Sequence, residues 1–230
     1  MISYVIAAHN SEAIIEDSVL RVVNFLRSRN SAFEVIVIEN GSIDHTSDIL
    51  TKLTQEIAEL RIDTSSVGLG HAFRKGILLS RGNLVIANAD DLPFGFSELK
   101  NILERSEIPQ VAIGSKAHKE SQLERSLGRT ISSAGLRLMR LVVLGLAIGD
   151  TQGTYVMEGD TARDLAQAAT EGGYIFTTEI AYLAKKRGIT IEEIPVQMDA
   201  SLRPSTVRVL RHSWQMFAGM IRIKNKHKLV

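Results

Sequence analysis

The sequence predicts an α/β fold, a single domain built on a mostly parallel sheet with helices on both faces. Stretches typical of strands and helices alternate five times between residues 4 and 114 with short connections, which favours parallel strands joined by crossover helices. The strand stretches are nearly continuous apolar runs, as expected when both faces of a sheet are covered. The 230 residues, 44% of them hydrophobic, are enough for one sizeable core.

Five strands are predicted in the first half of the chain, at residues 4–8, 33–38, 60–63, 84–87 and 111–114. Helices follow the first four. In the first helix Ile15, Val19 and Val22 share one face, and Asn10 or Ser11 is placed to cap its N-terminus. The second helix follows a turn at residues 39–42, the third ends at Leu79, and the fourth covers residues 94–105.

The pattern changes after Gly114. A long helical pattern is predicted at residues 121–147, then a short strand at 153–157, helices at 161–169 and 177–187, and a strand at 190–194. The last predicted helix carries an apolar stripe beside basic residues, which makes it amphipathic. The stripe consists of Val207, Leu210, Trp214, Phe217 and Ile221.

Composition excludes several classes of protein. Without cysteine the chain can form neither disulfides nor thiolate metal sites. No basic segment precedes an apolar run at the N-terminus, so no signal peptide is expected. The longest apolar run, at residues 141–148, has eight residues, whereas a membrane-spanning helix needs about twenty. We therefore expect no transmembrane segment.

The charge is unevenly distributed along the chain. The net charge is +1, yet residues 201–230 contain seven Lys or Arg and no acidic residue. Such a segment favours contact with an anionic surface, either membrane or nucleic acid. A solvated tail is the alternative interpretation.

A cluster of polar residues ends the predicted strand at residues 84–87. Asn88, Asp90 and Asp91 follow it, and Pro93 prevents simple continuation of the strand. Ligands collect at the carboxyl ends of strands in open α/β sheets, so two adjacent carboxylates there indicate a cation that holds phosphate. The alternative is that Asp90 or Asp91 caps the next helix.

Eight segments of the chain follow the order of a known set of motifs. Asn88-Ala-Asp90 stands at an Asp-x-Asp motif, and Glu39-Asn-Gly-Ser42 is similar to Asp-Asp-Gly-Ser. The other segments lie at residues 5–12, 68–72, 114–116, 150–152, 178–179 and 193–196. Together they resemble the family 2 glycosyltransferases of the GT-A fold, most closely the polyprenyl-phosphate branch that includes dolichol-phosphate mannose synthase.

The resemblance implies an inverting glycosyltransferase that moves a hexose from a UDP- or GDP-linked sugar to a polyprenyl-phosphate-type lipid. Its domain would cover residues 1–205, with a nucleotide-sugar half at 1–115 and an acceptor half at 116–205. Residues 206–230 would form a basic amphipathic helix and tail. The enzyme would be cytoplasmic and peripheral on the inner face of the membrane, with no nucleic-acid partner.

The resemblance also implies the residues of the site. Mg²⁺ or Mn²⁺ would be held by Asp90 and Asp91 and would neutralise charge on the leaving diphosphate. The acceptor phosphate would meet Lys116, Arg129 and Ser133, while Asp150, Gln152 and Glu179 would be the catalytic group. The implied nucleotide-sugar residues are Ala8, Asn10, Glu12, Glu39, Ser42, Gly68, Asn88, Ala89, Asp90 and Arg203.

Two other functions stay open at this point. A soluble hydroxyl or saccharide acceptor would need Asp150 or Glu179 as general base, whereas a phosphate acceptor is already anionic and needs little help. A catalytically degenerate relative would bind nucleotide or a partner without turnover, since Asn40 and Asn88 replace the family's carboxylates. For Glu39 and Asp150 individually, the alternative roles are a local turn cap and a strand-edge turn.

Overall fold

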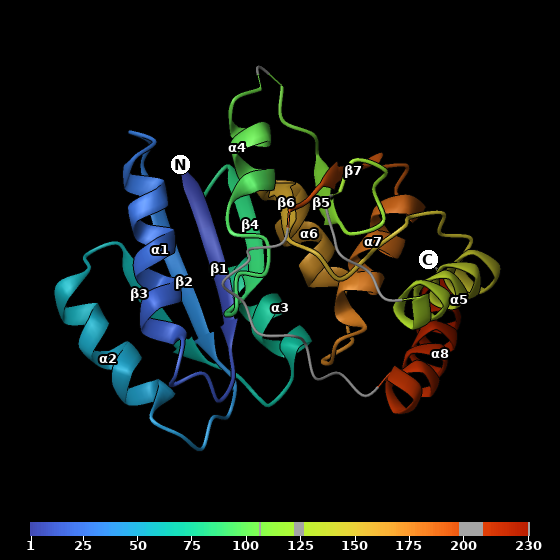
Figure 1. The fold of residues 1–230 in the computed structure, drawn as a ribbon, viewed down its shortest axis with the longest axis horizontal. Helices are drawn as coiled ribbons and strands as arrows, with labels where there is room; N and C mark the ends of the chain where they lie inside the picture. Colours follow the sequence, from blue (N-terminus) through green and yellow to red (C-terminus); the bar gives the residue numbers. More distant parts are fainter. Residues whose placement is uncertain (106, 122–126, 198–208, 230) are drawn as a thin grey trace.

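The computed structural model describes residues 1–105, 107–121, 127–197 and 209–229 and confirms the predicted class (Figure 1). One sheet runs through the molecule in the order β3-β2-β1-β4-β6-β5-β7. Its strands are β1 (Ile2–Ala8), β2 (Phe33–Glu39), β3 (Leu60–Thr64), β4 (Leu84–Ala89), β5 (Val111–Ser115), β6 (Tyr155–Glu158) and β7 (Ile191–Pro195).

The sheet is mostly parallel, as predicted. The pairs β1–β2, β1–β4, β2–β3 and β5–β7 are parallel. The short strand β6 lies between β4 and β5 and is antiparallel to both. The apolar pattern predicted a strand here but not its direction, because a four-residue buried strand has the same pattern in either orientation.

Helices cover both faces of the sheet. They are α1 (Ile15–Arg27), α2 (Thr46–Glu56), α3 (Leu69–Leu79), α4 (Ser97–Leu103), α5 (Leu127–Leu144), α6 (Gly159–Ala168), α7 (Phe176–Lys186) and α8 (Val209–Lys226), followed by a 3₁₀ turn at His227–Leu229. Residues of α1, α2 and α4 pack on one face, and residues of α3, α6 and α7 on the other. Helices α5 and α8 lie side by side at the end of the sheet near β7 (Figure 1).

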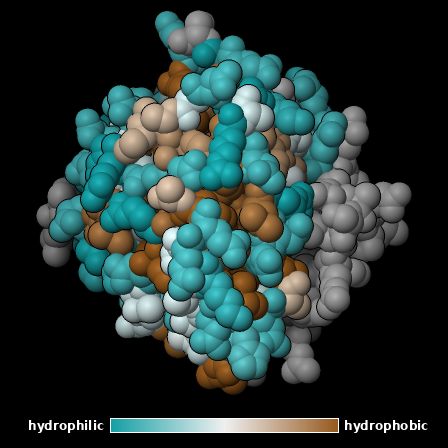
Figure 2. Space-filling model, turned by 90° about the vertical axis from the view of Figure 1, so that its left-hand side faces the viewer, coloured by the Kyte–Doolittle hydropathy of each residue, from teal (hydrophilic) through white to brown (hydrophobic). Residues whose placement is uncertain are grey.

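Alternating strand residues supply the two cores. In β1, Tyr4 and Ile6 enter the core under α1, whereas Val5 and Ala7 enter the core under α3. The amphipathic helices then turn their polar sides outward. Figure 2 shows this on the side where α1 and α2 lie, where hydrophilic residues cover most of the visible surface between smaller apolar patches.

Two capping predictions were wrong. Helix α1 begins at Ile15 without a side-chain cap, because the side chains of Asn10 and Ser11 bond to other loops. Helix α4 begins only at Ser97, too far along the chain for Asp90 or Asp91 to cap it. The long helical pattern at residues 121–147 corresponds to α5, and residues 122–126 lie outside the described part of the chain.

No helix in the described part of the chain is long and apolar enough to cross a membrane.

The close approach of α3 to β1 predicts a sharp difference between two glycines. A Cβ on Gly76 would lie 2.3 Å from Val5 Cγ1, so Gly76→Ala should lower the free energy of unfolding by about 1–3 kcal/mol through overpacking. Gly135, in α5, has no atom within 4 Å of an added Cβ. Gly135→Ala should therefore raise the free energy of unfolding by about 0.5–1 kcal/mol through helix propensity. Urea denaturation of both variants checks the pair, and equal effects would contradict the packing argument.

Candidate functional site

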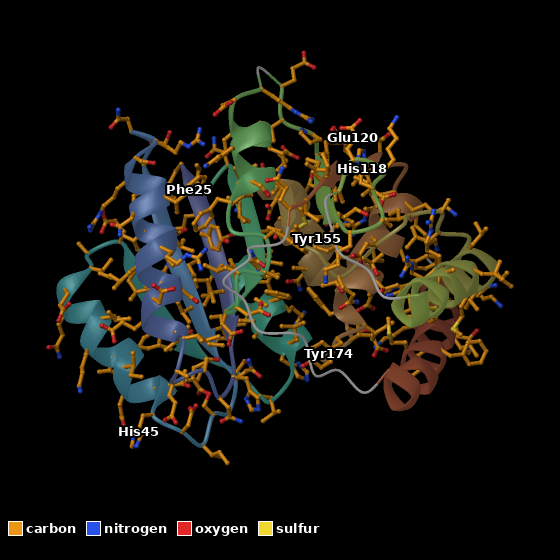
Figure 3. All side chains as sticks on the ribbon, viewed as in Figure 1. Phe25, His45, His118, Glu120, Tyr155 and Tyr174 are labelled. Atoms are coloured by element: carbon orange, nitrogen blue, oxygen red, sulfur yellow. The ribbon has the colours of Figure 1, made fainter. Side chains whose placement is uncertain are left out.

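The candidate site lies at the carboxyl edge of β1, β2 and β4. The three strands end in register, with Ala8 opposite Glu39 and Ala7 opposite Ala89. Their loops therefore meet at one edge, where open α/β sheets bind ligands. In Figure 3 His45, in the loop after β2, marks this lower edge of the molecule.

Asn40 joins the loops on the nucleotide side. Its side-chain Nδ2 donates to the Ala8 carbonyl (2.8 Å), and its Oδ1 accepts from the Gly68 N–H (3.1 Å). Its own carbonyl accepts from His9 Nδ1 (2.9 Å). The residue is 3% exposed. One buried amide thus connects β1, β2 and the start of α3.

Most of the predicted nucleotide-side residues come together in these loops. The Asn10 N–H donates to Ser42 Oγ (3.0 Å), and Asn10 Oδ1 accepts from the Ile43 N–H (2.9 Å). Asn10 adopts φ 51°, a conformation that Asn tolerates better than most residues. Glu12 accepts from the His45 N–H (3.0 Å). The loops after β1 and β2 therefore hold each other.

Glu39 also has the local role that was its alternative interpretation. Its Oε1 accepts a hydrogen bond from the Ser42 N–H and so closes its own turn. The second carboxylate oxygen is not used in that bond, so this contact leaves room for the predicted nucleotide role. That role stays a prediction.

Asp90 and Asp91 lie at the end of β4. Asp90 Oδ2 accepts from Ser11 Oγ and, at 3.4 Å, from the His9 N–H, while Ser18 Oγ donates to the Asp90 carbonyl (2.5 Å). Burial, followed by the nearby charge of Asp91, raises the pKa of Asp90. Loss of solvation also raises the pKa of Asp91, and the Lys116 ammonium opposes that rise.

These two carboxylates suit a divalent cation. They are adjacent hard oxygen donors, and a bound cation would oppose the loss of solvation that raises both pKa values. Across the described residues, no group of three or more His, Cys, Asp or Glu side chains is arranged to hold a metal. A cation here would therefore depend on Asp90, Asp91 and the phosphates of a bound ligand.

Asn88 faces the interior. Its Nδ2 donates to Tyr4 Oη (3.2 Å), its Oδ1 accepts from the Ala89 N–H (2.9 Å), and it is 4% exposed. Burial, the largest cause, raises the pKa of Tyr4, and the charge of Glu98 adds to the rise. The geometry thus gives Asn88 a structural role, and its predicted nucleotide contact stays untested.

Glu98 is a fully buried carboxyl in the same region. Thr154 Oγ1 donates to its Oε1 (2.7 Å) and Ser97 Oγ to its Oε2 (3.3 Å). No ion pair to Glu98 is seen among the described residues. Burial raises its pKa above the usual value, so the neutral acid is favoured more in the folded protein than in the unfolded chain.

Lys116 lies between the two proposed halves of the site. It follows β5 directly, and its Nζ lies 5.3 Å from the centroid of the Phe94 ring, over the loop that carries Asp91. Its ammonium is close enough to oppose the rise in the pKa of Asp91. The predicted acceptor-phosphate lysine therefore also borders the predicted metal site.

Asp150 and Gln152 lie in the loop that leads into β6. Asp150 Oδ2 accepts from the Lys116 N–H (3.4 Å) and its Oδ1 from the Gln152 N–H (2.9 Å). Gln152 Nε2 donates to Thr177 Oγ1 (3.0 Å) and to the Tyr174 carbonyl (3.2 Å). The structure thus brings Asp150, Gln152 and Lys116 together. The bond from Gln152 also gives Asp150 the turn role that was its alternative interpretation.

Glu179 is separate from this group. It is fully buried, and its carboxylate accepts from the Thr170 N–H (2.9 Å), the Glu171 N–H (2.8 Å) and Thr170 Oγ1 (3.0 Å). His227 Nε2 lies 2.7 Å from its Oε1. This geometry argues against Glu179 as a general base, because its lone pairs are occupied in the interior.

Tyr155 and Tyr174 show the two sides of this region. Tyr155, the first residue of β6, lies inside the molecule and donates to the Thr177 carbonyl (2.6 Å), whereas Tyr174 is exposed (Figure 3). Burial raises the pKa of Tyr155 far above its usual value. Tyr155 therefore supports the start of α7 and is not available for proton transfer.

Three predicted site residues cannot be placed by their contacts: Arg203, Arg129 and Ser133. Arg203 lies outside the described residues, as does Val207 of the last predicted apolar stripe. Arg129 and Ser133 belong to α5, one helical turn apart.

Four residues important to the site were not recognised from the sequence. Ser11, Asn40, Arg140 and Glu193 each hold a loop that carries a predicted site residue. Asn40 was visible only as a departure from the family motif, and Glu193 only as part of a motif. Ser11 was predicted only as a helix cap, because its partner Asp90 is 79 residues away along the chain. Arg140 was not predicted to bond to the loop of Ile148 and Gly149, because a basic residue in a helical pattern does not reveal which backbone its side chain meets.

Comparison with known proteins is consistent with this arrangement. Residues 3–157 match the profile described as glycosyl transferase family 2. The chain is 27% identical to the dolichyl-phosphate beta-glucosyltransferase of Saccharomyces cerevisiae and 28% identical to that of Homo sapiens. Each match covers 85% of this chain and 66% of the relative, so the chain spans slightly less than two thirds of their length.

A solved structure confirms the fold. Glucosyl-3-phosphoglycerate synthase of Mycobacterium tuberculosis, in complex with Mn²⁺, UDP-glucose and phosphoglyceric acid, superposes with a TM-score of 0.69 at 19% identity. The match covers 98% of this chain and 79% of that one.

Glu98 generates a testable pH dependence. Its pKa is 4.5 when unperturbed and higher in the folded protein, so above pH 4.5 the native state holds a proton that the unfolded chain releases. The free energy of unfolding should then fall with rising pH by up to about 1.4 kcal/mol per unit until the folded pKa is passed. Glu98→Gln removes this contribution.

The free energy of unfolding of Glu98→Gln, relative to the native protein, should therefore increase as the pH rises from 4.5 and level off once the folded pKa of Glu98 is passed. Urea denaturation across this range measures the difference. Glu104→Gln is the matched control, because Glu104 is 68% exposed and its ion pair with Arg29 is at the surface. A constant difference between Glu98→Gln and native protein would contradict the raised pKa.

Proposed function

The chain belongs to glycosyl transferase family 2, and from this membership we propose that it transfers a hexose from a nucleoside diphosphate sugar to a polyprenyl phosphate at a membrane surface. The observation that carries the proposal is the meeting of the nucleotide-side loops, Asp90–Asp91 and Lys116 at one edge of the sheet. Inversion at the sugar carbon remains a prediction from family resemblance.

The donor would lie across the ends of β1, β2 and β4. Glu39 offers a carboxylate oxygen to a base edge or to ribose hydroxyls, and Asn10 and Ser42 fix the loop that carries it. UDP is the leading candidate nucleotide, since the structural neighbour from M. tuberculosis was crystallised with UDP-glucose. A GDP-linked sugar is the competing donor.

The diphosphate would be held next to Asp90 and Asp91. Mg²⁺ or Mn²⁺ bound by these carboxylates would supply Lewis-acid stabilisation of the charge that grows on the leaving phosphate. Ser11 and the His9 N–H fix one oxygen of Asp90, so its orientation is set before substrate binds. Lys116 contributes a further positive charge on the side facing the acceptor.

A polyprenyl phosphate fits this chemistry better than a hydroxyl compound. The named relatives are dolichyl-phosphate beta-glucosyltransferases. A phosphate oxygen attacks as an anion and needs little help from a base. That suits a site in which Glu179 is withdrawn into the interior and Asp150 is tied to two backbone N–H groups. Asp150 would then position the acceptor and need not remove a proton.

The membrane surface would be met by α5 and α8. Neither helix contains an acidic residue. On α5, Leu138, Leu141 and Val142 are 62%, 47% and 71% exposed, and Ile221 on α8 is 40% exposed. Exposed apolar residues on basic helices are typical of elements that lie in the interface of an anionic bilayer. This contact is part of the proposal.

Asp90→Asn tests the donor site. Removing one carboxylate should weaken metal-dependent binding of the nucleotide sugar by about 10- to 100-fold, the usual scale for a lost charge-assisted contact. The measurement is a thermal-shift titration of UDP-, GDP- and dTDP-sugars with and without Mn²⁺. Asp17→Asn, 74% exposed on α1, is the matched control and should bind like the native protein. The proposal fails if no nucleotide stabilises the native protein under any metal condition.

The double variant Leu138→Glu, Val142→Glu tests the membrane contact. Each replacement removes apolar area worth about 1.5–3 kcal/mol in the bilayer interface and adds an opposing charge, so binding to anionic vesicles should fall at least about tenfold. Co-sedimentation with vesicles of phosphatidylcholine and phosphatidylglycerol measures it. Ile108→Glu, 43% exposed beside β5, is the control and should not change binding. Equal binding by the double variant and the native protein would exclude this face.

A further inference from the structure

Two charged side chains hydrogen-bond to the same peptide units in the loop before β6. Arg140 Nη2, from α5, donates to the carbonyls of Ile148 (2.9 Å) and Gly149 (2.7 Å). Glu193 Oε2, from β7, accepts from the Gly149 N–H (3.0 Å), and its Oε1 from the Asp150 N–H (3.3 Å). The loop is therefore held through its carbonyls by a cation and through its N–H groups by a carboxylate.

The loop has no space for a side chain at Gly149, where Arg140 and Glu193 bind it. A Cβ at this position would lie 2.5 Å from Ala117 Cβ and 2.9 Å from Glu193 Oε1. The Glu193 carboxylate is itself fixed by Ser115 Oγ, which donates to Oε1 at 2.5 Å. These contacts thus fix the path of the loop backbone between α5, β5 and β7.

The burial of Arg140 is costly. The residue is 3% exposed, and burial lowers the pKa of its guanidinium. Its Nε is buried without a hydrogen-bond partner, and an unsatisfied buried donor costs about 1–3 kcal/mol. Replacing buried charges by apolar residues often stabilises a protein, so a cation in this place is poorly explained by stability alone. Its geometry offers a better explanation.

The loop residues that Arg140 and Glu193 bind lead directly to the acceptor side of the proposed site. Asp150 follows Gly149, and its carboxylate accepts from the N–H groups of Lys116 and Gln152. Gln152 in turn donates to Thr177 at the start of α7. A shift at Gly149 would therefore move Asp150 and Gln152 together.

We propose that Arg140 and Glu193 are positioning residues that fix Asp150 and Gln152 for the acceptor step. This inference rests on the proposed glycosyl transfer for its catalytic consequence, while the loop geometry is independent of it. Neither side chain needs to touch substrate. Arginine suits the role because the two hydrogens of its planar Nη2 donate to two carbonyls in fixed directions, which a lysine ammonium does not reproduce.

The test compares Arg140→Met and Glu193→Gln with Arg163→Met. Arg163 is a matched control because it also donates to backbone carbonyls, those of Ser80 (3.2 Å) and Gly82 (3.1 Å), at the opposite edge of the sheet. Arg140→Met and Glu193→Gln should lower kcat by about 10- to 100-fold, the scale of a small misplacement, with the KM for nucleotide sugar within about twofold. Arg163→Met should lower stability without this split. Arg140→Lys should recover part of kcat.

A double-variant cycle shows whether Arg140 acts through Asp150. In an Asp150→Asn background the kcat loss from Arg140→Met should shrink markedly, since residues that act as a unit are not additive. Fully additive losses would overturn the inference.

Amide hydrogen exchange separates this inference from the proposed function. Exchange at residues 149–152 should rise in Arg140→Met and remain native-like in Arg163→Met, whether or not any acceptor is glycosylated. If the native protein transfers no sugar but this difference appears, the proposed function fails and the positioning of the loop stands. If exchange at 149–152 is the same in both variants, the positioning role is wrong.

Discussion

The nucleotide side of the site depends on the amide of Asn40. Its backbone N–H and its Nδ2 both donate to the Ala8 carbonyl (3.0 and 2.8 Å), and its Oδ1 accepts from the Gly68 N–H (3.1 Å). The side chain must therefore donate in one direction and accept in the other. An amide can do both, whereas an ionised carboxylate only accepts. With Asp at this position, the Ala8 carbonyl would lose its side-chain donor, and α3 would be tied less firmly to β1. The departure from the family motif thus has a structural reason and is weak support for a degenerate enzyme.

The sequence predicted what local pattern encodes. Apolar runs located every strand, and helical spacing located every helix in the described part of the chain, with ends shifted by a few residues. It did not predict the antiparallel direction of β6 or the start of α1, because both depend on contacts between remote segments. Ser11 illustrates the limit. It looked like a helix cap, yet its hydroxyl donates to Asp90, 79 residues away along the chain. The site residues were found as members of motifs, but the residues that orient them were not.

Fewer residues of the proposed metal site can bind a cation than the sequence motif suggests. Asn88 points into the core and bonds to Tyr4, so the first motif position supports the sheet. The turn after Asp91 contains Leu92 at φ 42°, a left-handed conformation that is uncommon for a non-glycine residue. Full burial of the Leu92 side chain keeps this turn in place. The conformation of this turn also fixes the position of Asp91 relative to Asp90. In the proposed function, these two neighbouring carboxylates would bind a cation whose coordination the phosphates of the donor would complete.

Helix α5 connects the two ends of the proposed reaction. Its outer side exposes Leu138, Leu141 and Val142, the residues proposed to face lipid, and its inner side holds the loop of Asp150 through Arg140. Arg140 and Leu141 are adjacent on the helix, so a rigid movement of α5 on the membrane would also displace Gly149, to which Arg140 is bonded. Close-packed interiors transmit such movements because they do not deform continuously. In the proposed function, the helix that would meet the bilayer therefore also holds the loop of Asp150, and this would link binding of the protein to lipid with the geometry of the proposed acceptor site.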